Sequence, residues 1–267
     1  MSLDLSRDLA RAEALADLAR PLALAAFAQS LTVDRKADHS PVTEADRAIE
    51  ATLRHALARA CPEDGILGEE AASSGLERRR VWAIDPIDGT RAFILGIPLF
   101  STLIALCLDG VPVLGLMDFP ALNQRYSAIR GQPSRCNGLR LRTHANTRLA
   151  EATYCATSPE MFTRAEQEQV AHLRKGLADM RYGTDAFGVA ALLAGRAQGV
   201  VESDLRPFDF LASVPLIEGA GGVVSDWQGT ALRLESGPQL LASANPALHE
   251  AALARLNAQD RGLWSKE

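Results

Sequence analysis

Lysine is scarce in this sequence, and the net charge is acidic. Only three lysines occur, Lys36, Lys175 and Lys266, and the formal net charge is −5 at pH 7. A nucleic-acid surface needs clustered basic side chains to neutralise phosphates, whereas the arginines here are dispersed. We therefore expect no nucleic-acid partner. An acidic protein can still bind a phosphate if its carboxylates first bind divalent cations, so the position of the acids matters more than their number.

Long hydrophobic runs and paired cysteines are also absent. The longest apolar stretch, residues 97–108, is shorter than the roughly 20 residues that span a bilayer. The first 29 residues mix charged side chains among alanine and leucine, unlike the uninterrupted apolar segment of a signal peptide. We expect no membrane association and a cytoplasmic location. The four cysteines lack the CxxC spacing of a zinc knuckle or a redox motif. They are Cys61, Cys107, Cys136 and Cys155.

Helical signals occur in both halves of the chain. Apolar residues recur at helical spacing through residues 9–27, and Pro21 predicts a kink or a break in that helix. Residues 43–46 fit a capping box that begins a second helix. A capping residue ahead of a proline predicts another helix from residues 157–160, and Asp209 is expected to open a later one.

Strand signals concentrate in the first half. The apolar run Val81–Ile84 predicts a buried strand that ends at Asp85-Pro86. Residues 99–108 and 111–117 are apolar strands joined by Asp109-Gly110, which is typical of a tight hairpin. A β-sheet is therefore expected there.

The chain is long enough for two packed halves, with 267 residues of which 47% are hydrophobic. After about residue 145 the pattern changes to helices and strands in alternation. We expect an N-terminal α/β half at residues 1–145 that carries most of the functional acids, and a C-terminal α/β half at residues 146–267 that adds Asp209 and substrate contacts.

The strongest local signal for chemistry is the segment Asp85 to Thr90. Asp85 and Asp88 flank a proline turn directly after a strand, so both side chains can point to one side. The turn exposes the Ile87 carbonyl, and the amides of Gly89 and Thr90 are free to face a phosphate oxygen. Asp88 is also expected to take part in binding the substrate. For an isolated segment of this kind, an ordinary Asx turn and helix cap is the alternative interpretation.

Two more acidic elements change that balance. Glu69-Glu70 follows an apolar run, and Asp209 lies at a helix entrance; alone, they could be a solvated charge pair and a helix cap. Together the segments resemble the inositol monophosphatase family over nearly the whole chain. The resemblance is carried, in the family's order, by Ser40-Pro41-Val42-Thr43-Glu44-Ala45-Asp46, Gly68-Glu69-Glu70, Asp85 to Thr90, and Asp209 followed by Glu218-Gly219-Ala220-Gly221-Gly222.

The resemblance implies an α/β (α+β) fold of layered α-β-α-β-α type, commonly a homodimer, and a metal-dependent phosphatase. It assigns one Mg²⁺ to Glu69, Asp85 and the Ile87 carbonyl, and a second to Asp85, Asp88 and Asp209. A third, weaker ion would use Glu69 and water. Lithium sensitivity is also implied.

Electrostatics requires cations in such a pocket independently of the family. Two carboxylates ~4 Å apart repel by about 4 kcal/mol at an effective dielectric of ~20. The summed repulsion of four would rival the roughly 5–15 kcal/mol that stabilises a whole protein. Ligation by oxygen alone, without His or Cys, favours Mg²⁺ first and Mn²⁺ second.

Catalytic roles follow from the resemblance. Thr90 and Asp46 would form a hydrogen-bonded pair that, with Glu69, orients and deprotonates the attacking water, so no covalent enzyme intermediate is needed. From the pattern alone, Asp46 is as well explained by helix capping. Lys36 lies where the family has a mobile loop near the site, although a solvated surface lysine is the alternative.

The substrate is expected to be a small phosphate monoester, and histidinol phosphate is favoured. The chain resembles the histidinol-phosphate phosphatase branch through residues 91–94, and it has Phe208 where the inositol branch usually has tryptophan. Asp185 and Glu202 align with the substrate-contacting region, and two acids favour a cationic amino alcohol over a neutral polyol. Thr184 departs from that branch, as does Ala71-Ala72.

The sequence is compatible with several alternatives. Glu202 also occurs in the inositol branch, and Asp185 could instead cap the following helix. Inositol 1-phosphate or a broader range of sugar phosphates are the alternative substrates. A protein of another class, a metal-binding scaffold without turnover, would be expected to lose a ligand, whereas all of them are present.

Overall fold

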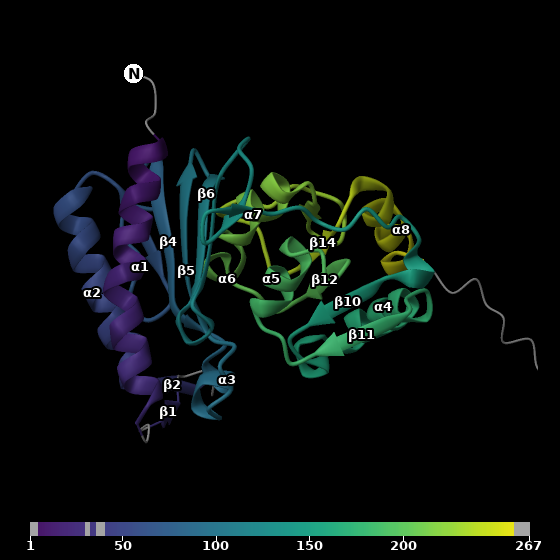
Figure 1. Ribbon diagram of the computed structural model, residues 1–267, viewed down its shortest axis with the longest axis horizontal. Helices are drawn as coiled ribbons and strands as arrows, with labels where there is room; N and C mark the ends of the chain where they lie inside the picture. Colours follow the sequence, from purple (N-terminus) through teal and green to yellow (C-terminus); the bar gives the residue numbers. More distant parts are fainter. Residues whose placement is uncertain (1–4, 30–32, 36–40, 259–267) are drawn as a thin grey trace, which may run out of the picture.

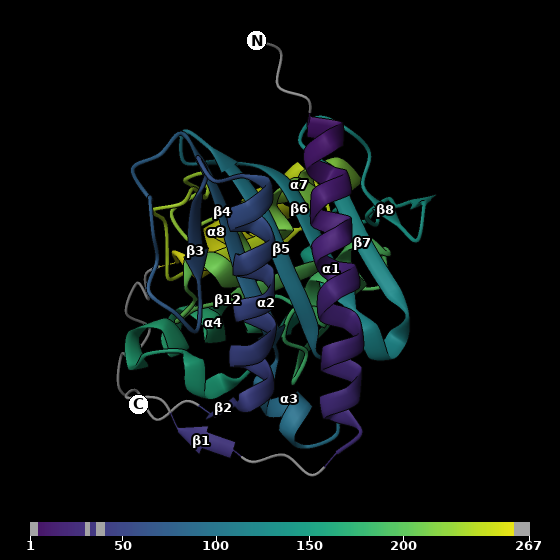
Figure 2. The same cartoon turned by 90° about the vertical axis from the view of Figure 1, so that its left-hand side faces the viewer.

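The computed structural model describes residues 5–29, 33–35 and 41–258. Its elements form five layers in the order helices, sheet, helices, sheet, helices, which confirms the expected α-β-α-β-α architecture (Figures 1 and 2). Helices α1 (Leu5–Phe27) and α2 (Glu44–Ala60) form the first layer and lie side by side on one face of a seven-stranded sheet.

The seven-stranded sheet follows the strand order β3-β4-β5-β6-β7-β8-β9. Strands β3 and β4 are parallel, and the other neighbouring strands are antiparallel. The strands are β3 (Gly65–Gly68), β4 (Arg80–Asp88), β5 (Ser101–Leu108), β6 (Val111–Phe119), β7 (Gln124–Ile129), β8 (Arg135–Cys136) and β9 (Leu139–Arg140). A separate antiparallel pair consists of β1 (Val33–Arg35) and β2 (Pro41–Thr43).

The second sheet follows the order β11-β10-β12-β14-β13 and mixes parallel with antiparallel pairs. Its strands are β10 (Thr153–Ala156), β11 (Asp179–Tyr182), β12 (Gly199–Glu202), β13 (Val223–Ser225) and β14 (Leu240–Ser243). Between the sheets lie α5 (Phe187–Leu193), α6 (Pro207–Phe210) and α7 (Ser213–Ala220), and outside the second sheet lie α4 (Arg164–Lys175) and α8 (Pro246–Leu256) (Figure 1). The short helices are α3 (Thr90–Ile94), η1 (Pro120–Leu122), η2 (Leu149–Glu151) and η3 (Pro159–Met161).

Strand β5 shows why the central strands read as continuous apolar runs. Its side chains alternate between two cores, as the period of two in a strand requires. Ile104 and Leu106 join the cluster beneath α1 and α2, whereas Leu103, Ala105 and Cys107 join the cluster that lies between the sheets. Because both faces are covered, neither needs polar residues.

The expected hairpin is confirmed. Strands β5 and β6 are antiparallel and are joined by Asp109 (φ 49°) and Gly110 (φ 76°). Two successive residues at positive φ match the right-handed twist of the flanking strands, which is why this residue pair suits the turn.

The two sheets come from different parts of the sequence. The first uses residues 65–140 and the second residues 153–243, while one buried cluster joins residues from both. The division into halves at residue 145 falls between the sheets and stays a prediction.

Helix α1 continues through Pro21, so the expectation of a break there was wrong. A proline in a helix interior costs roughly 3 kcal/mol, and tertiary contacts on both sides of it offset this cost. Ala19 and Ala23 are buried, and Arg20 forms a bidentate ion pair with the buried Asp118 at 2.7 and 3.1 Å.

The helix expected from residues 157–160 also begins later than the sequence suggested. Pro159–Met161 is only a short 3₁₀ turn, and α4 begins at Arg164. Thr163 and Glu166 form a reciprocal capping box there, which satisfies the first amides of the helix more completely than the single cap from Ser158.

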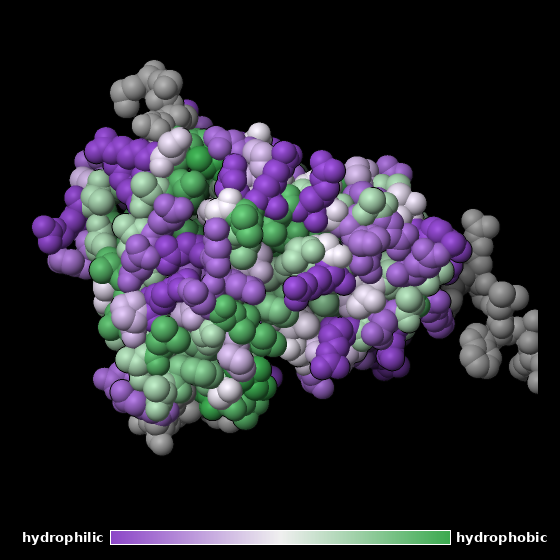
Figure 3. Space-filling model, in the orientation of Figure 1, coloured by the Kyte–Doolittle hydropathy of each residue, from purple (hydrophilic) through white to green (hydrophobic). Residues whose placement is uncertain are grey.

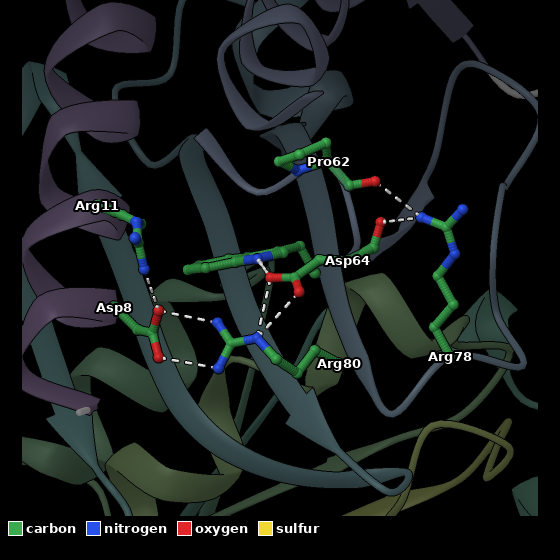
Figure 4. Close-up of polar contacts among 7 residues, drawn as sticks. Asp8, Arg11, Pro62, Asp64, Arg78 and Arg80 are labelled. Carbon is green, nitrogen blue, oxygen red and sulfur yellow. Dashed lines mark hydrogen bonds and ion pairs between the residues drawn. The ribbon is translucent and has the colours of Figure 1, made fainter. Parts of the chain in front are cut away.

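A buried ion-pair network ties α1 to the start of β4 (Figure 4). The Arg80 guanidinium donates to both carboxylate oxygens of Asp8 and to Asp64, and Asp8 also accepts from Arg11 at 2.7 Å. The Trp82 indole donates to Asp64 at 2.8 Å. The network therefore fixes the end of β4 opposite the functional acids.

No helix within the described ranges is long and apolar enough to cross a membrane. The face seen in Figure 3 mixes hydrophilic side chains with smaller apolar areas. Described exposed apolar side chains include Leu95 and Ile97, which follow α3.

Candidate active site

Strand β4 carries the two aspartates of the segment that the sequence singled out. Asp85 is 2% exposed, and Asp88 ends the strand. The pairing with β5 shifts register between these two residues, and the Thr102 hydroxyl donates to the Pro86 carbonyl at 2.8 Å inside that irregularity. The bulge places the aspartates differently from a regular strand, in which side chains three apart point to opposite faces.

Gly89 makes the sharp turn from β4 into α3. Its φ of 79° is left-handed, which glycine adopts without a steric penalty, and α3 begins at Thr90 as expected. A Cβ at Gly89 would also lie 3.4 Å from the Asp185 side chain. The turn therefore brings the start of α3 into contact with a loop of the second half.

The predicted acids gather in one place although they come from distant segments. Burial raises the pKa of Asp85 well above its usual range, and the charges of Glu69, Asp88 and Asp209 raise it further. Burial likewise raises the pKa of Asp88, followed by the charges of Asp185 and Asp209. Bound cations relieve mutual repulsion of this kind among buried carboxylates.

The contacts of these carboxylates leave oxygen available for a divalent cation. Asp85 Oδ1 is buried without a hydrogen-bond partner, which is an oxygen left over for a ligand. Asp88 Oδ2 accepts from the Ala186 amide at 3.0 Å, and Asp209 Oδ2 accepts from the Arg206 amide at 2.6 Å. Residues 5–29, 33–35 and 41–258 contain no group of three His, Cys, Asp or Glu side chains already arranged as a ligand set. The chemistry of the donors fits Mg²⁺, while their convergence on one ion remains a prediction.

Asp46 caps α2 and still keeps an oxygen unused. Its Oδ2 accepts from the Thr43 amide at 2.8 Å and from the Thr43 hydroxyl at 2.5 Å, which confirms the capping box. Its Oδ1 is buried without a partner, and burial raises the pKa of Asp46, as does the charge of Glu69, although the Thr43 hydrogen bonds oppose the shift. The expected Thr90–Asp46 hydrogen bond is not formed, because the Thr90 hydroxyl donates to the Ile87 carbonyl at 3.1 Å.

Asp185 and Glu202 line the same cavity as Asp88 and Asp209. Glu202 accepts from the amide and the hydroxyl of Thr157, both at 3.1 Å. Burial raises the pKa of Glu202 to about 8, against the lowering effect of the Thr157 hydrogen bonds. The cavity therefore concentrates carboxyl groups beside the predicted phosphate position.

Asp185 does not cap the following helix. Helix α5 begins at Phe187 after Ala186, with no side-chain cap, and Asp185 has a left-handed φ of 45°. Burial raises the pKa of Asp185, while the charge of Arg91 lowers it. A non-glycine residue at positive φ stores strain of the kind found at functional sites.

Sequence reasoning missed the role of Thr157 and of Arg91. Thr157 follows β10 and Glu202 ends the neighbouring parallel strand β12, so the strand-end signal used for Asp85 could have found this pair. Arg91 lines a second cavity of about 440 Å³ that shares Thr157 and Asp185 with the first. Lys36, predicted near the site, lies outside the described residues.

Comparisons with known proteins identify the family of this chain. The model of the inositol monophosphatase family matches residues 4–261. The histidinol-phosphatase of Chlorobaculum parvum is 36% identical over 95% of this chain and 98% of its own length. The chloroplastic bifunctional phosphatase IMPL2 of Arabidopsis thaliana is 36% identical over 95% of this chain and 76% of its own length. The structure of an inositol monophosphatase from Zymomonas mobilis is 38% identical, with a TM-score of 0.88 over 96% of this chain and 100% of that one.

Proposed function

This chain belongs to the inositol monophosphatase family and is a phosphoric monoester hydrolase, and we propose that it is an Mg²⁺-dependent histidinol-phosphate phosphatase. The reaction converts histidinol phosphate and water to histidinol and phosphate. Mn²⁺ is the expected substitute for Mg²⁺, with two to three ions per subunit. A cytoplasmic homodimer is the proposed form of the enzyme.

The carboxyl groups of Asp185 and Glu202 in one cavity carry the choice of substrate. Histidinol bears an ammonium group, whose charge would lower the raised pKa of these carboxyl groups and gain charge-assisted hydrogen bonds from their ionised form, whereas a neutral polyol does neither. The histidinol-phosphatase of Chlorobaculum parvum supports the same choice by similarity.

The proposed metal ligands are Glu69, Asp85, the Ile87 carbonyl, Asp88 and Asp209. When bound there, Mg²⁺ supplies neutralisation of the phosphate, activation of water and stabilisation of the leaving oxygen. The unpaired Asp85 Oδ1 and the mutual repulsion of the carboxylates support this assignment.

The other roles belong to the chain's own groups. Asp46, held by its bonds to Thr43 and with Oδ1 unused, would orient the attacking water together with Glu69 and accept its proton. The Thr90 hydroxyl would have to leave the Ile87 carbonyl to join that pair. The amides of Gly89 and Thr90 would hold a phosphate oxygen.

The phosphate ester of inositol is the second candidate. The Zymomonas mobilis inositol monophosphatase supports it by similarity, and Glu202 could accept a hydroxyl of a polyol instead of an ammonium.

A substrate panel tests the proposal. We expect phosphate release that requires Mg²⁺ and is lost in EDTA, with the highest kcat/KM on histidinol phosphate. A higher kcat/KM on inositol 1-phosphate, or on several sugar phosphates, would transfer the assignment to the second candidate. No metal-dependent release from any ester would favour the scaffold interpretation.

A further inference from the structure

Helix α2 presents three charged side chains at spacings of four residues, Asp46, Glu50 and Arg54, which lie on one face of the helix. Asp46 belongs to the proposed catalytic group. Glu50 is also buried, at 1% exposure, yet the reaction scheme gives it no part. A carboxylate is buried at a cost unless its oxygens are fully paired, so its partners indicate its role.

Both oxygens of Glu50 hold the backbone that follows Glu69. Oε2 accepts from the Glu70 amide at 2.7 Å, and Oε1 accepts from the Ala71 amide at 3.0 Å. Oε1 also accepts from Arg54 Nε at 2.6 Å.

The Arg54 guanidinium binds the carbonyl groups of the same backbone segment. Nη2 donates to the Ala71 carbonyl at 2.9 Å, and Nη1 donates to the Ala72 carbonyl at 3.2 Å. The Glu50–Arg54 pair therefore makes four hydrogen bonds with the backbone of three successive residues, two to amides and two to carbonyls.

The segment bound by this pair, residues 70–72, contains no helix or strand. It leaves β3 after Gly68 and returns where Ile66 and Ser74 exchange backbone hydrogen bonds at 2.8 and 2.9 Å. Ala71 and Ala72 are exposed, so side-chain burial does not hold them. The position of this backbone therefore depends on the helix beside it.

Gly68 fits against the same pair. A Cβ there would lie 2.4 Å from Glu50 Oε1 and 2.5 Å from Arg54 Nη2. No left-handed φ is recorded for Gly68, so close approach is the reason for glycine at this position.

We propose that the Glu50–Arg54 pair is a positioning device that fixes the backbone of residues 70–72 and, through it, the Glu69 carboxylate beside Asp85. The inference rests on the proposed role of Glu69. Helix α2 would then set the relative positions of two groups at once, because Asp46 lies one turn before Glu50. Glu50 and Arg54 act through the backbone and make no contact with the substrate.

Glu50→Gln is the sharpest test because both Glu50 oxygens accept from N–H donors. A glutamine amide has to turn its NH₂ toward one of those donors, so at least one of these hydrogen bonds is lost while the side-chain volume stays nearly the same. We expect a folded enzyme with kcat reduced about 10- to 100-fold, and a Mg²⁺ concentration for half-maximal activity raised by about tenfold. The KM for substrate at saturating Mg²⁺ should change by less than about threefold, because the phosphate and leaving-group contacts are intact.

Two further variants keep the test decisive if Glu50→Gln fails to fold. Gly68→Ala presses on the pair without changing either member, and Arg54→Lys keeps the charge but loses the fork that spans both carbonyls. Both should shift the Mg²⁺ dependence in the same direction. Arg79→Gln is the matched control, because it removes an exposed arginine paired with Asp109 and should leave all kinetic constants unchanged.

Glu69→Gln, measured in parallel, separates the two hypotheses. Activity near the unmutated level in Glu69→Gln would refute the role of Glu69 itself. If Glu69→Gln is inactive while the Glu50, Arg54 and Gly68 variants match the control in kcat and Mg²⁺ dependence, the positioning inference is overturned. A lower melting temperature with unchanged kinetic constants would reduce the pair to a structural role and overturn it equally.

Discussion

Asp88 shows how a carboxylate proposed as a metal ligand can be unfavourable for the metal-free fold. Its ionised form is opposed by burial and by the charges of Asp185 and Asp209, while the Ala186 amide stabilises it. An asparagine at this position can still accept that hydrogen bond through its amide oxygen.

We therefore expect Asp88→Asn to abolish detectable turnover and to leave the fold intact. In EDTA the variant should be more stable than the parent by on the order of 1 kcal/mol, because one repelling charge is gone. Steady-state kinetics with Mg²⁺ and urea denaturation in EDTA measure the two effects. Turnover near the parent's rate would contradict the assignment of Asp88.

Asp185 is the residue that we propose separates a cationic from a neutral leaving group. We expect Asp185→Asn to lower kcat/KM on histidinol phosphate by about tenfold more than on a neutral ester, since a hydrogen bond to a charged group contributes roughly 1.5–3 kcal/mol. Parallel kinetics on both esters decide this, and equal losses would remove the case for a cationic alcohol.

His249 is a buried group outside the site with its own pH signature. Its ring lies between Ser225 and Ser243 at 2.9 and 3.2 Å, and burial lowers the pKa of His249 to about 4. The unfolded chain therefore binds a proton at a higher pH than the folded one. The stabilising contribution of the neutral ring is fully present above about pH 6.5 and is lost as the pH falls toward 4.

We expect this loss to amount to at most about 3 kcal/mol, at 1.36 kcal/mol for each unit of pKa shift. The measurement is the free energy of unfolding of the parent and of His249→Gln between pH 4 and 7.5. The variant should have the shallower dependence, and identical slopes would disprove the effect. Taking the difference cancels the titration of the shared carboxylates.

Sequence signals correctly predicted those structures that depend on residues adjacent in the chain. The capping box of α2 and the hairpin at Asp109-Gly110 depend on residues next to one another, and both are confirmed. The continuity of α1 through Pro21 depends on partners such as Asp118, which is 98 residues from Arg20. Two capping residues, Ser158 and Thr163, lie close together before α4. The sequence pattern alone did not show that α4 begins after Thr163.

The candidate site shows the same difference between local signals, which the sequence reveals, and contacts between distant segments, which it does not. Strand ends and acidic segments identified the acids that gather, whereas hydrogen bonds between distant segments were not predicted. Thr157 and Glu202 are 45 residues apart, and Glu50 and Glu70 are 20 apart. The Thr90–Asp46 bond, inferred by resemblance, is replaced by a local bond to Ile87.

The ion-pair network in Figure 4 attaches α1 to β4, so its loss should affect stability more than catalysis. Removing Asp8 leaves Arg80, whose side chain is 23% exposed, with Asp64 alone. We expect Asp8→Ala to lower the free energy of unfolding by about 2–4 kcal/mol, near the value for breaking a buried ion pair. Asp109→Ala breaks the exposed pair with Arg79 and should cost less than about 1 kcal/mol.

Urea denaturation of both variants measures this difference, and kcat of Asp8→Ala should remain within about threefold of the parent because the network lies at the far end of β4. Equal stability losses in the two variants would show that burial adds nothing to the Asp8 contacts.

The proposed cluster of acids should make the stability of the protein depend jointly on pH and on divalent cations. Burial and mutual repulsion raise the pKa values of Asp85 and Asp88, so the metal-free folded state binds more protons than the unfolded chain. In EDTA, the contribution of these groups should therefore lower the free energy of unfolding as the pH rises from about 4, the usual range of an Asp pKa.

Mg²⁺ should reverse that loss, because cations bind the ionised carboxylates and compete with protons. At a Mg²⁺ concentration 100 times the dissociation constant at pH 8 we expect a stabilisation of about 2.7 kcal/mol at that pH, and the same concentration should stabilise the protein less at pH 6, where protons compete. Thermal denaturation with and without Mg²⁺ at both pH values measures it, and Asp85→Asn provides the control in which the increment should nearly vanish. If Mg²⁺ stabilises the parent and Asp85→Asn equally at both pH values, the ions bind elsewhere, and the carboxylates of the two halves do not share a cation.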